Sequence, residues 1–262
     1  MNELPAAITC LISSHIGYSP TPLNLTHPRV LVRATNNPFR RFTLLSSLAT
    51  KSKPEEAPRF LKFAKGDRLG PLFTFMLSNG PRPEECFGLQ WPDLDLEKGR
   101  VEIYHVLKWN RTGGGWRFRD YPKTDAGFRT LTLDPPVIAV LQEWRKQQLL
   151  ERLQAGKRYQ NNNLVFSTPT GEPLYPTNVH RRHFRPLIKS SRLNPALRLY
   201  DLRHSFATLS LAAGVEPKMV SYALGHASVA FTLDVYCHMV EKMRLNAAGK
   251  LEGILFPKAK RR

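Results

Sequence analysis

The sequence YDLRHSFATLSLAAGVEPKMVSYALGHASVAFTLDVYCHM, at residues 200–239, carries most of the information about the fold. Apolar residues recur at helical spacing before Gly214, between Gly214 and Gly225, and again after Gly225. Because glycine commonly ends a helix, the stretch predicts three consecutive helices joined by two short turns. The same order of helices would also fit a helix-turn-helix, so a function limited to DNA binding stays open.

The first of these helices is expected to bury one apolar face and to leave Arg203 beside that face. A salt bridge is the ordinary role for an arginine in such a place. His204, next to a serine and a phenylalanine, is interpreted as a hydrogen-bonded structural histidine. The predicted buried face consists of Leu202, Phe206, Leu209 and Ala213.

Upstream of this stretch the sequence alternates between helical and strand patterns. Two apolar clusters of helical character follow Pro54, and Gly80 is expected to end the second of them. A further helix is predicted to open at Pro135 and Pro136. We therefore expect an α+β fold that is mainly α-helical, with one small three-stranded antiparallel sheet. The expected strands lie within residues 100–109, 116–123 and 128–133.

Composition narrows the class of partner. The 262 residues include 39 Lys and Arg against 21 Asp and Glu, a formal net charge of +18, which favours a polyanion and most simply a nucleic acid. A membrane surface or the ribosome stays open on charge alone. The three scattered cysteines suggest neither a disulfide framework nor a zinc site, and no window has the length of a membrane span. We expect a cytoplasmic, nucleoid-associated protein without a membrane partner.

One basic stretch, HRRHFRPLIKSSR at residues 180–192, has two interpretations. It could neutralise DNA phosphates, which would make binding strongly dependent on salt, or it could be a solvated surface face. With this net charge the two are weighed about evenly. The candidate DNA-binding residues are Arg181, Arg182, Arg185 and Lys189.

The segment SNGPRPEECFGLQW, residues 78–91, sets Arg82 between two prolines. Pro83 suits the first turn of a helix, and the residue before a proline is biased toward the extended conformation of an N-cap. Glu85 is then within reach of the guanidinium. A helix N-terminus also attracts anions, so the turn is predicted to aim Arg82 at a phosphate.

These features, in this order, resemble the tyrosine recombinase family of the phage integrase type, over residues 54–250. The most specific parts are DLRHSFAT and LGHASVAFTLDVYCH. The resemblance implies a catalytic domain that cuts and rejoins double-stranded DNA through a phosphotyrosine, without ATP, an obligatory metal or another cofactor. It also implies a homo-oligomer, a tetramer, on DNA. The roles it implies are the nucleophile for Tyr236, phosphate binding for Arg82, Arg203 and His226, the general acid for Lys123, and support of the first arginine for Glu85.

Elementary chemistry agrees with these roles. Two guanidinium forks can bind the non-bridging oxygens of a phosphodiester bidentately and stay charged at every working pH. A tyrosine, with an ordinary pKa of about 10, needs a positive field or a base to attack at neutral pH. A lysine at a turn can protonate the leaving 5′-oxygen.

Two departures from the family pattern leave alternatives open. Tyr200 stands three residues before the second arginine, where most members have histidine, and tyrosine is a much weaker proton acceptor. Residues 1–53 are expected to form an irregular lead segment or linker, with the usual DNA-binding front domain truncated or absent, and residues 251–262 a basic tail. Both departures favour the alternative of a catalytically impaired DNA-binding remnant. A DNA-relaxing enzyme of the type IB topoisomerase kind, which shares the chemistry, is a further alternative.

Overall fold

The computed structural model describes residues 55–109, 115–119 and 128–236 of the chain. All of them belong to one unit, residues 38–262, and a second unit, residues 1–37, lies outside the described part. The α-helices are α2 (Glu56–Ala64), α3 (Gly70–Asn79), α4 (Pro83–Gly88), α5 (Pro135–Ala155), α6 (Pro176–Asn178), α7 (Arg185–Ser190), α8 (Asp201–Ala212), α9 (Pro217–Leu224) and α10 (Val229–Val235). The π-helix η4 (Val179–Phe184) joins α6 to α7, and η1 (Trp91–Asp93) and η3 (Gly156–Arg158) are 3₁₀ turns.

Glycine turns end the helices where the sequence predicts. Gly80 ends α3 in the left-handed conformation at φ 68°, and Gly225 ends α9 at φ 61°. At Gly80 the requirement is also steric, because a Cβ atom would lie 2.2 Å from the ring of Phe206 on α8. The end of α3 is thereby fixed against α8, and the chain leaves it toward Arg82.

The sheet is antiparallel, as predicted, but its strands are divided differently. A three-stranded sheet has the order β1-β2-β5, and a separate hairpin joins β3 to β4. The expected strand over residues 100–109 is broken at Tyr104 and His105, where His105 Nδ1 lies 2.9 Å from Asp93 Oδ2. Beyond the break, the backbone of Leu107 lies against Gly88 of α4. A Cβ atom on residue 88 would come within 2.8 Å of the amide nitrogen of Leu107. The strands are β1 (Leu94–Asp95), β2 (Arg100–Ile103), β3 (Val106–Trp109), β4 (Trp116–Arg119) and β5 (Arg129–Thr132).

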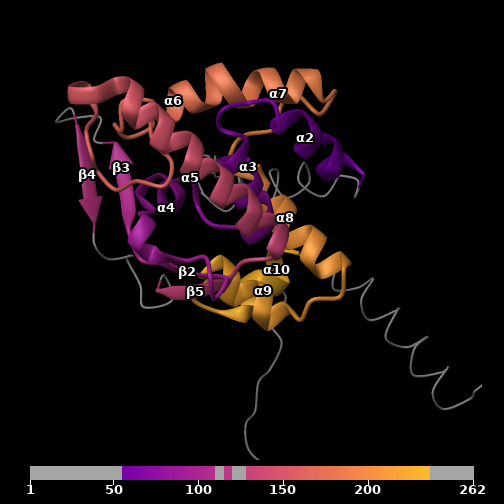
Figure 1. The fold of residues 1–262 in the computed structure, drawn as a ribbon. Helices are drawn as coiled ribbons and strands as arrows, with labels where there is room; N and C mark the ends of the chain where they lie inside the picture. The colour runs from indigo at the N-terminus through magenta and orange to yellow at the C-terminus, as the bar shows by residue number, and fades with distance from the viewer. Residues whose placement is uncertain (1–54, 110–114, 120–127, 237–262) are drawn as a thin grey trace, which may run out of the picture. The chain divides into compact units, whose positions relative to one another are not determined.

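A cluster of aromatic rings forms the centre of the helical layer. Phe60 of α2, Phe73 of α3 and Phe184 of η4 are buried, with ring centroids 5.9–6.0 Å apart. Edge and tilted arrangements of this kind add to the stabilisation from burial. Figure 1 shows α2, α3 and α7 close together on one side of α5.

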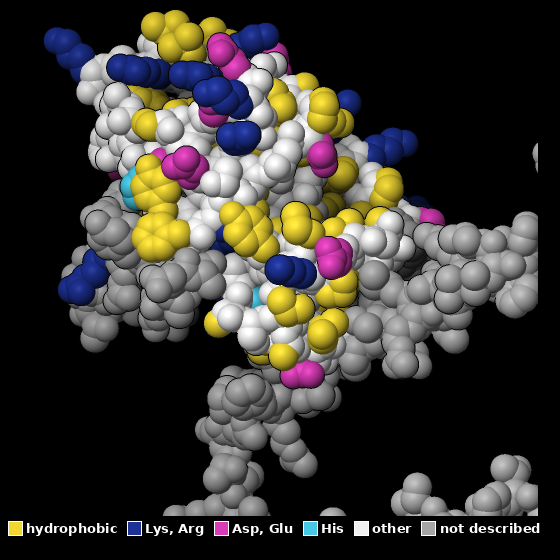
Figure 2. All heavy atoms as spheres, turned by 90° about the horizontal axis from the view of Figure 1, so that it is seen from below, with side chains coloured by type: hydrophobic (Ala, Val, Ile, Leu, Met, Phe, Trp, Pro, Cys, Tyr) yellow, Lys and Arg dark blue, Asp and Glu magenta, His cyan; other side chains and the backbone are white. Residues whose placement is uncertain are grey.

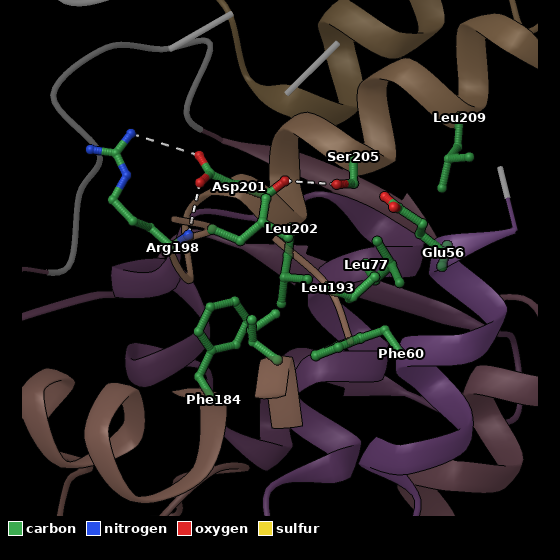
Figure 3. Close-up of a pocket in the computed structure, with 13 residues that line it drawn as sticks. Glu56, Phe60, Leu77, Phe184, Leu193, Arg198, Asp201, Leu202, Ser205 and Leu209 are labelled. Carbon is green, nitrogen blue, oxygen red and sulfur yellow. Dashed lines mark hydrogen bonds and ion pairs between the residues drawn. The ribbon is translucent and has the colours of Figure 1, made fainter. Parts of the chain in front are cut away.

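The N-terminus of α8 is held by a local hydrogen-bonded turn. The Arg198 amide donates to Asp201 Oδ2 at 2.8 Å, and the hydroxyl of Ser205 donates to the Asp201 carbonyl at 3.0 Å. Figure 3 shows Asp201 facing Arg198 beside a small apolar pocket lined by residues such as Phe60 and Leu202. The start of α8 is therefore anchored both to its preceding turn and to the phenylalanine cluster.

The buried face of α8 differs from the predicted one. Phe206 and Leu209 are half-buried and Ala213 is exposed, so that of the expected residues only Leu202 is fully buried. Arg203 faces the interior instead of lying beside it. Arg203 can be buried because carbonyl groups from other segments accept the hydrogen bonds of its guanidinium. The buried residues are Asp201, Leu202, Arg203, His204, Ala207, Thr208 and Leu211.

Within the described ranges, no helix is both long and apolar enough to cross a bilayer.

Candidate active site

Arg82 is the N-cap of α4, in the extended conformation that the proline after it favours. Glu85 accepts two hydrogen bonds from it, one from the backbone amide to Oε2 and one from Nη1 to Oε1, each 2.7 Å long. The guanidinium is one-third exposed, whereas Glu85 is buried. The carboxylate therefore holds the partly exposed arginine at the start of the helix.

Glu85 is shared with a second arginine, Arg129 at the start of β5. Arg129 donates from Nη2 to Glu85 Oε2 at 2.7 Å and from Nη1 to Oε1 at 3.2 Å, and its side chain is fully buried. Burial alone would raise the pKa of Glu85. The attraction and hydrogen bond of Arg129, with Arg82 and Arg203 nearby, outweigh burial and lower this pKa to about 2. Glu85 is thus an anion at any working pH.

Three guanidinium groups converge on the C-terminal end of α9. Arg129 Nε donates to the Ala223 carbonyl at 2.7 Å, Arg203 Nη2 to the Leu224 carbonyl, and Arg82 Nη2 to the Gly225 carbonyl at 3.1 Å. The last carbonyls of a helix have no partner within the helix and carry the negative end of its dipole. Successive carbonyls of this turn therefore accept hydrogen bonds from arginines of β5, α8 and the start of α4. Those carbonyls belong to Ala223, Leu224 and Gly225.

Arg203 is the innermost member of this group. Its Nη1 also donates to the Gly80 carbonyl at 2.8 Å, at the turn that precedes Arg82. Burial, together with the neighbouring Arg82, lowers the pKa of Arg203 to about 10. It therefore remains charged at neutral pH. The three arginines face one buried carboxylate, so the cluster has an excess of positive charge that suits an anion.

His226 follows directly after the α9 carbonyls. Its Nδ1 lies 2.7 Å from the hydroxyl of Thr232, which is fully buried in α10. Burial, and after it the positive charges of Arg203 and Arg82, lowers the pKa of His226 to about 3. The imidazole is thus neutral at pH 7. If the Thr232 hydroxyl donates to Nδ1, then Nε2 carries the proton and can donate a hydrogen bond to a phosphate oxygen.

Tyr236 lies just beyond the last residue of α10 and is only 3% exposed. It packs in a small apolar cluster with residues of α8 and α9. Its hydroxyl is 2.8 Å from Nδ1 of His204. Burial raises the pKa of Tyr236, and Arg203 only partly opposes this effect. In the described state the phenol is protonated and covered. The cluster consists of Ala207, Leu211, Val220, Leu224 and Tyr236.

Tyr200, which stands where the resemblance predicts a histidine, is the N-cap of α8 and is half-buried. Its ring meets that of His204 edge-on, with centroids 5.3 Å apart. Tyr200 therefore borders the imidazole that contacts Tyr236. Lys123, the predicted general acid, lies outside the described residues.

The predicted DNA-binding residues lie on η4 and α7. All four side chains are exposed, and within the described segments none of them forms an ion pair. Figure 2 shows that Lys and Arg side chains also occur across the face seen from below, among exposed hydrophobic groups. The four residues are Arg181, Arg182, Arg185 and Lys189.

Two residues of the site, Arg129 and His204, are not among the catalytic residues predicted from the sequence. The burial of Arg129 could have been predicted from the sequence. Side chains alternate along β5, so Arg129 lies on the same buried face as Leu131 and Leu133. An arginine on the inward face of a strand needs an internal partner. The prediction that His204 is hydrogen-bonded is confirmed, but its contact with Tyr236 spans 32 residues and has no local signal.

The profile of the phage integrase family matches residues 52–243. The chain belongs to this family. Among its curated relatives are a XerC-like tyrosine recombinase of Caldanaerobacter subterraneus, 30% identical over 209 residues, and an integrase of Streptomyces ambofaciens, 32% identical over 208 residues. Each alignment covers 76% of this chain, and 53% and 52% of the two relatives. The chain thus spans about half the length of these phage integrase family members.

Solved structures of the family share the fold. The Tn1549 transposon integrase in complex with transposon right end DNA is 25% identical, with a TM-score of 0.60. The match covers 71% of this chain and 60% of the transposon integrase. The predicted fold class, mainly helical with a small antiparallel sheet, is thereby confirmed.

Proposed function

We propose that this protein cleaves and rejoins duplex DNA at a specific site through a 3′-phosphotyrosyl intermediate. The observation that carries the proposal is the convergence of Arg82 and Arg203 on adjacent carbonyls of one turn, next to His226. Relatives that are integrases and recombinases, one of them bound to transposon DNA, support the same activity.

The charge of the cluster suits the transition state. A phosphodiester carries one negative charge, and attack by a phenolate would bring a second. Arg82 and Arg203 would bind the non-bridging oxygens, since the buried Glu85 is already neutralised by Arg129. Loss of one such donor lowers the rate by about 10²- to 10³-fold.

The chemical step exchanges one phosphodiester for another. The Tyr236 oxygen attacks phosphorus, the bond from phosphorus to the 5′-oxygen breaks, and the DNA 3′-end remains on the tyrosine. The leaving 5′-oxygen takes a proton, for which Lys123 is the proposed donor. Because the phosphotyrosyl ester conserves the bond, a 5′-hydroxyl can reverse the step without ATP.

The phenol proton must be accepted as Tyr236 attacks. We assign this role to His204, whose Nδ1 is hydrogen-bonded to the Tyr236 hydroxyl. Burial lowers the pKa of His204, so that the imidazole is neutral and able to accept a proton at pH 7. Its charged neighbours are Asp201, which raises that pKa, and Arg203 and Arg198, which lower it. Tyr200 would then orient this imidazole by its edge contact.

Tyr236 must also become accessible, because its side chain is buried in the described state. α10 is seven residues long, and its N-cap Ser228 accepts a hydrogen bond from the Phe231 amide at 3.3 Å. We propose that a shift of this short helix, on DNA binding, exposes the phenol to the phosphate beside Arg203 while its hydroxyl stays within reach of His204.

The DNA contacts and the assembly follow from the same proposal. The exposed arginines of η4 and the basic residues of α7 would neutralise phosphates flanking the cleavage site. We propose residues 54–250 as the catalytic domain, 1–53 as a lead segment or linker, and 251–262 as a basic tail. A tetramer on DNA and association with the nucleoid belong to the proposal as well.

A catalytically impaired DNA-binding protein is the second candidate. Tyr200, in place of the usual histidine, is the observation that favours it. The two candidates are separated by a suicide duplex, nicked near the cleavage position and built from the ends of mobile elements flanking the gene. A covalent adduct that is lost in Tyr236→Phe supports the enzyme. Binding of the duplex without any adduct supports the impaired protein.

A further inference from the structure

The second half of α5 exposes an apolar patch away from the arginine cluster. Leu149, Leu150 and Leu153 are 56%, 53% and 71% exposed, although the opposite face of the same helix is buried in the core. Leu149 and Leu153 are one turn apart and so lie on the same side of the helix. Three large apolar side chains together on a helix surface favour a contact with another molecule.

A groove of about 740 Å³ runs along this side of α5. Trp91 and Tyr159 supply aromatic walls, and each is covered by a guanidinium. Arg145 lies 5.1 Å from the centre of the Trp91 ring, and Arg152 lies 5.7 Å from that of Tyr159. Leu149 also lines the groove, so the groove and the leucine patch are continuous.

Hydrogen bonds fix the walls of the groove. Trp91 Nε1 donates to Gln148 Oε1 at 2.6 Å, and Gln148 Nε2 donates to the Leu164 carbonyl at 3.0 Å. The Trp91 amide donates to the Asn163 carbonyl at 2.9 Å. The groove is therefore preformed, which lowers the entropic cost of binding a partner.

The charge along the groove is mainly positive. Arg145 and Arg152 form no ion pair with any described residue, and Lys146 pairs only with the exposed Glu143, at 3.2 Å. Glu97 is the acidic residue among those that line the groove. Guanidinium groups stacked on aromatic rings keep their edges available to a carboxylate or a phosphate.

The chain itself is a poor occupant of this groove. A second copy carries the same charge of +18. Residues 1–54 contain six Lys and Arg against one Glu, and residues 237–262 contain seven Lys and Arg against two Glu. Either segment would bring positive charge to a positive surface. A nucleic acid would match the arginines but would leave the three leucines without an apolar partner.

We propose that the outer face of α5, with its groove, docks an acidic amphipathic helix of a partner protein. Arg145 and Arg152 are seven residues apart, two turns or about 10 Å along the helix. They would receive carboxylates at the same spacing on the partner. Leu149, Leu150 and Leu153 would meet an apolar stripe between those carboxylates, in the way that an amphipathic helix fills a hydrophobic groove. This surface is independent of the proposed chemistry.

The test uses the full chain and a fluorescein-labelled 20-residue helical peptide. The peptide carries glutamates seven residues apart and leucines three and four residues apart on one face, and a second peptide has the same composition in scrambled order. We expect saturable binding of the first peptide, measured by anisotropy, and at least tenfold weaker binding of the scrambled one. Leu149→Ser with Leu153→Ser should weaken binding at least tenfold, as should Arg145→Glu with Arg152→Glu.

A matched control separates docking from general attraction. Lys157→Glu with Arg158→Glu changes the net charge by the same amount on η3, and neither residue lines the groove. This variant should keep its affinity within threefold. Equal loss in the control, equal binding of the two peptides, or no binding at millimolar peptide would each overturn the proposal. The proposal would also fail if the Leu149→Ser, Leu153→Ser double variant bound anionic vesicles or a 30-base-pair duplex more weakly than the wild type, since the patch would then serve a membrane or DNA.

Discussion

Removal of Arg129 should destabilise the site from within. We consider Arg129→Met, which keeps much of the volume and deletes the guanidinium. The variant loses two buried hydrogen bonds to Glu85 and a partly buried one to the Ala223 carbonyl. Glu85 stays buried, with Arg82 as its remaining hydrogen-bonded arginine.

The size of the effect follows from the carboxylate. The pKa of Glu85 falls from its ordinary 4.5 to about 2 although burial opposes the change, a preference for the ionised form of about 3 kcal/mol. Removing one partner of a buried ion pair generally costs about 3–5 kcal/mol. Because Arg82 still neutralises part of the charge, we expect the free energy of unfolding to fall by about 3 kcal/mol at pH 7.

The pH dependence has a definite sign. A lowered carboxyl pKa stabilises the fold above pH 4.5, and this contribution is lost as the pH falls toward 2. In Arg129→Met the pKa of Glu85 is higher than in the wild type. The difference in stability between wild type and variant should therefore narrow as the pH falls below 4.5.

Urea unfolding at pH 7 and pH 4 measures both effects. The control is the double variant Arg129→Met with Glu85→Gln, which also removes the buried carboxylate and should recover at least 1 kcal/mol at pH 7. A cost below about 1 kcal/mol for Arg129→Met, or a double variant no more stable than the single one, would refute the role given to Arg129.

Three further changes test separate parts of the account. His204→Asn should slow single-turnover cleavage by about 10²-fold or more and abolish the rise in rate with pH through the His204 pKa, which burial holds below its usual 6.5; an unchanged profile would exclude His204 as proton acceptor. Arg181→Ala with Arg182→Ala should reduce the slope of log binding constant against log salt concentration by about 2. An unchanged slope would show that the two arginines are solvated surface residues without phosphate contacts. Gly80→Ala should cost about 2 kcal/mol in urea unfolding, because φ is 68° and the new methyl would meet Phe206; a cost below about 0.5 kcal/mol would contradict the packing described for this turn.

Local signals predicted the elements of the fold well. The glycine turns after α3, α8 and α9, the prolines at the start of α5, and the helical order from residue 200 onward all depend on a few neighbouring residues. The sheet was predicted in type but not in pairing. The break at Tyr104 and His105 results from the approach of α4 and the contact with Asp93, which the strand pattern does not contain.

Contacts between distant segments limited the prediction of the site. Helical periodicity placed Arg203 outside the buried face of α8. The guanidinium is buried because the carbonyls of Gly80 and Leu224 accept its hydrogen bonds, and these distant contacts leave no trace in the periodicity. The pairing of Arg82 with Glu85 was accessible, since three residues separate them on one helix turn. The arginine of β5 could have been noticed from its inward phase, but its partners lie 44 and 94 residues away.

The central claim is that Tyr236 attacks the DNA. The most direct measurement is to trap the wild-type protein on a suicide duplex, digest the adduct with protease and nuclease, and map the nucleotide by mass spectrometry. We predict one modified peptide, in which Tyr236 is linked to the 3′-phosphate of a nucleotide. An adduct on any other residue, or none on a duplex that the protein binds specifically, would contradict the account.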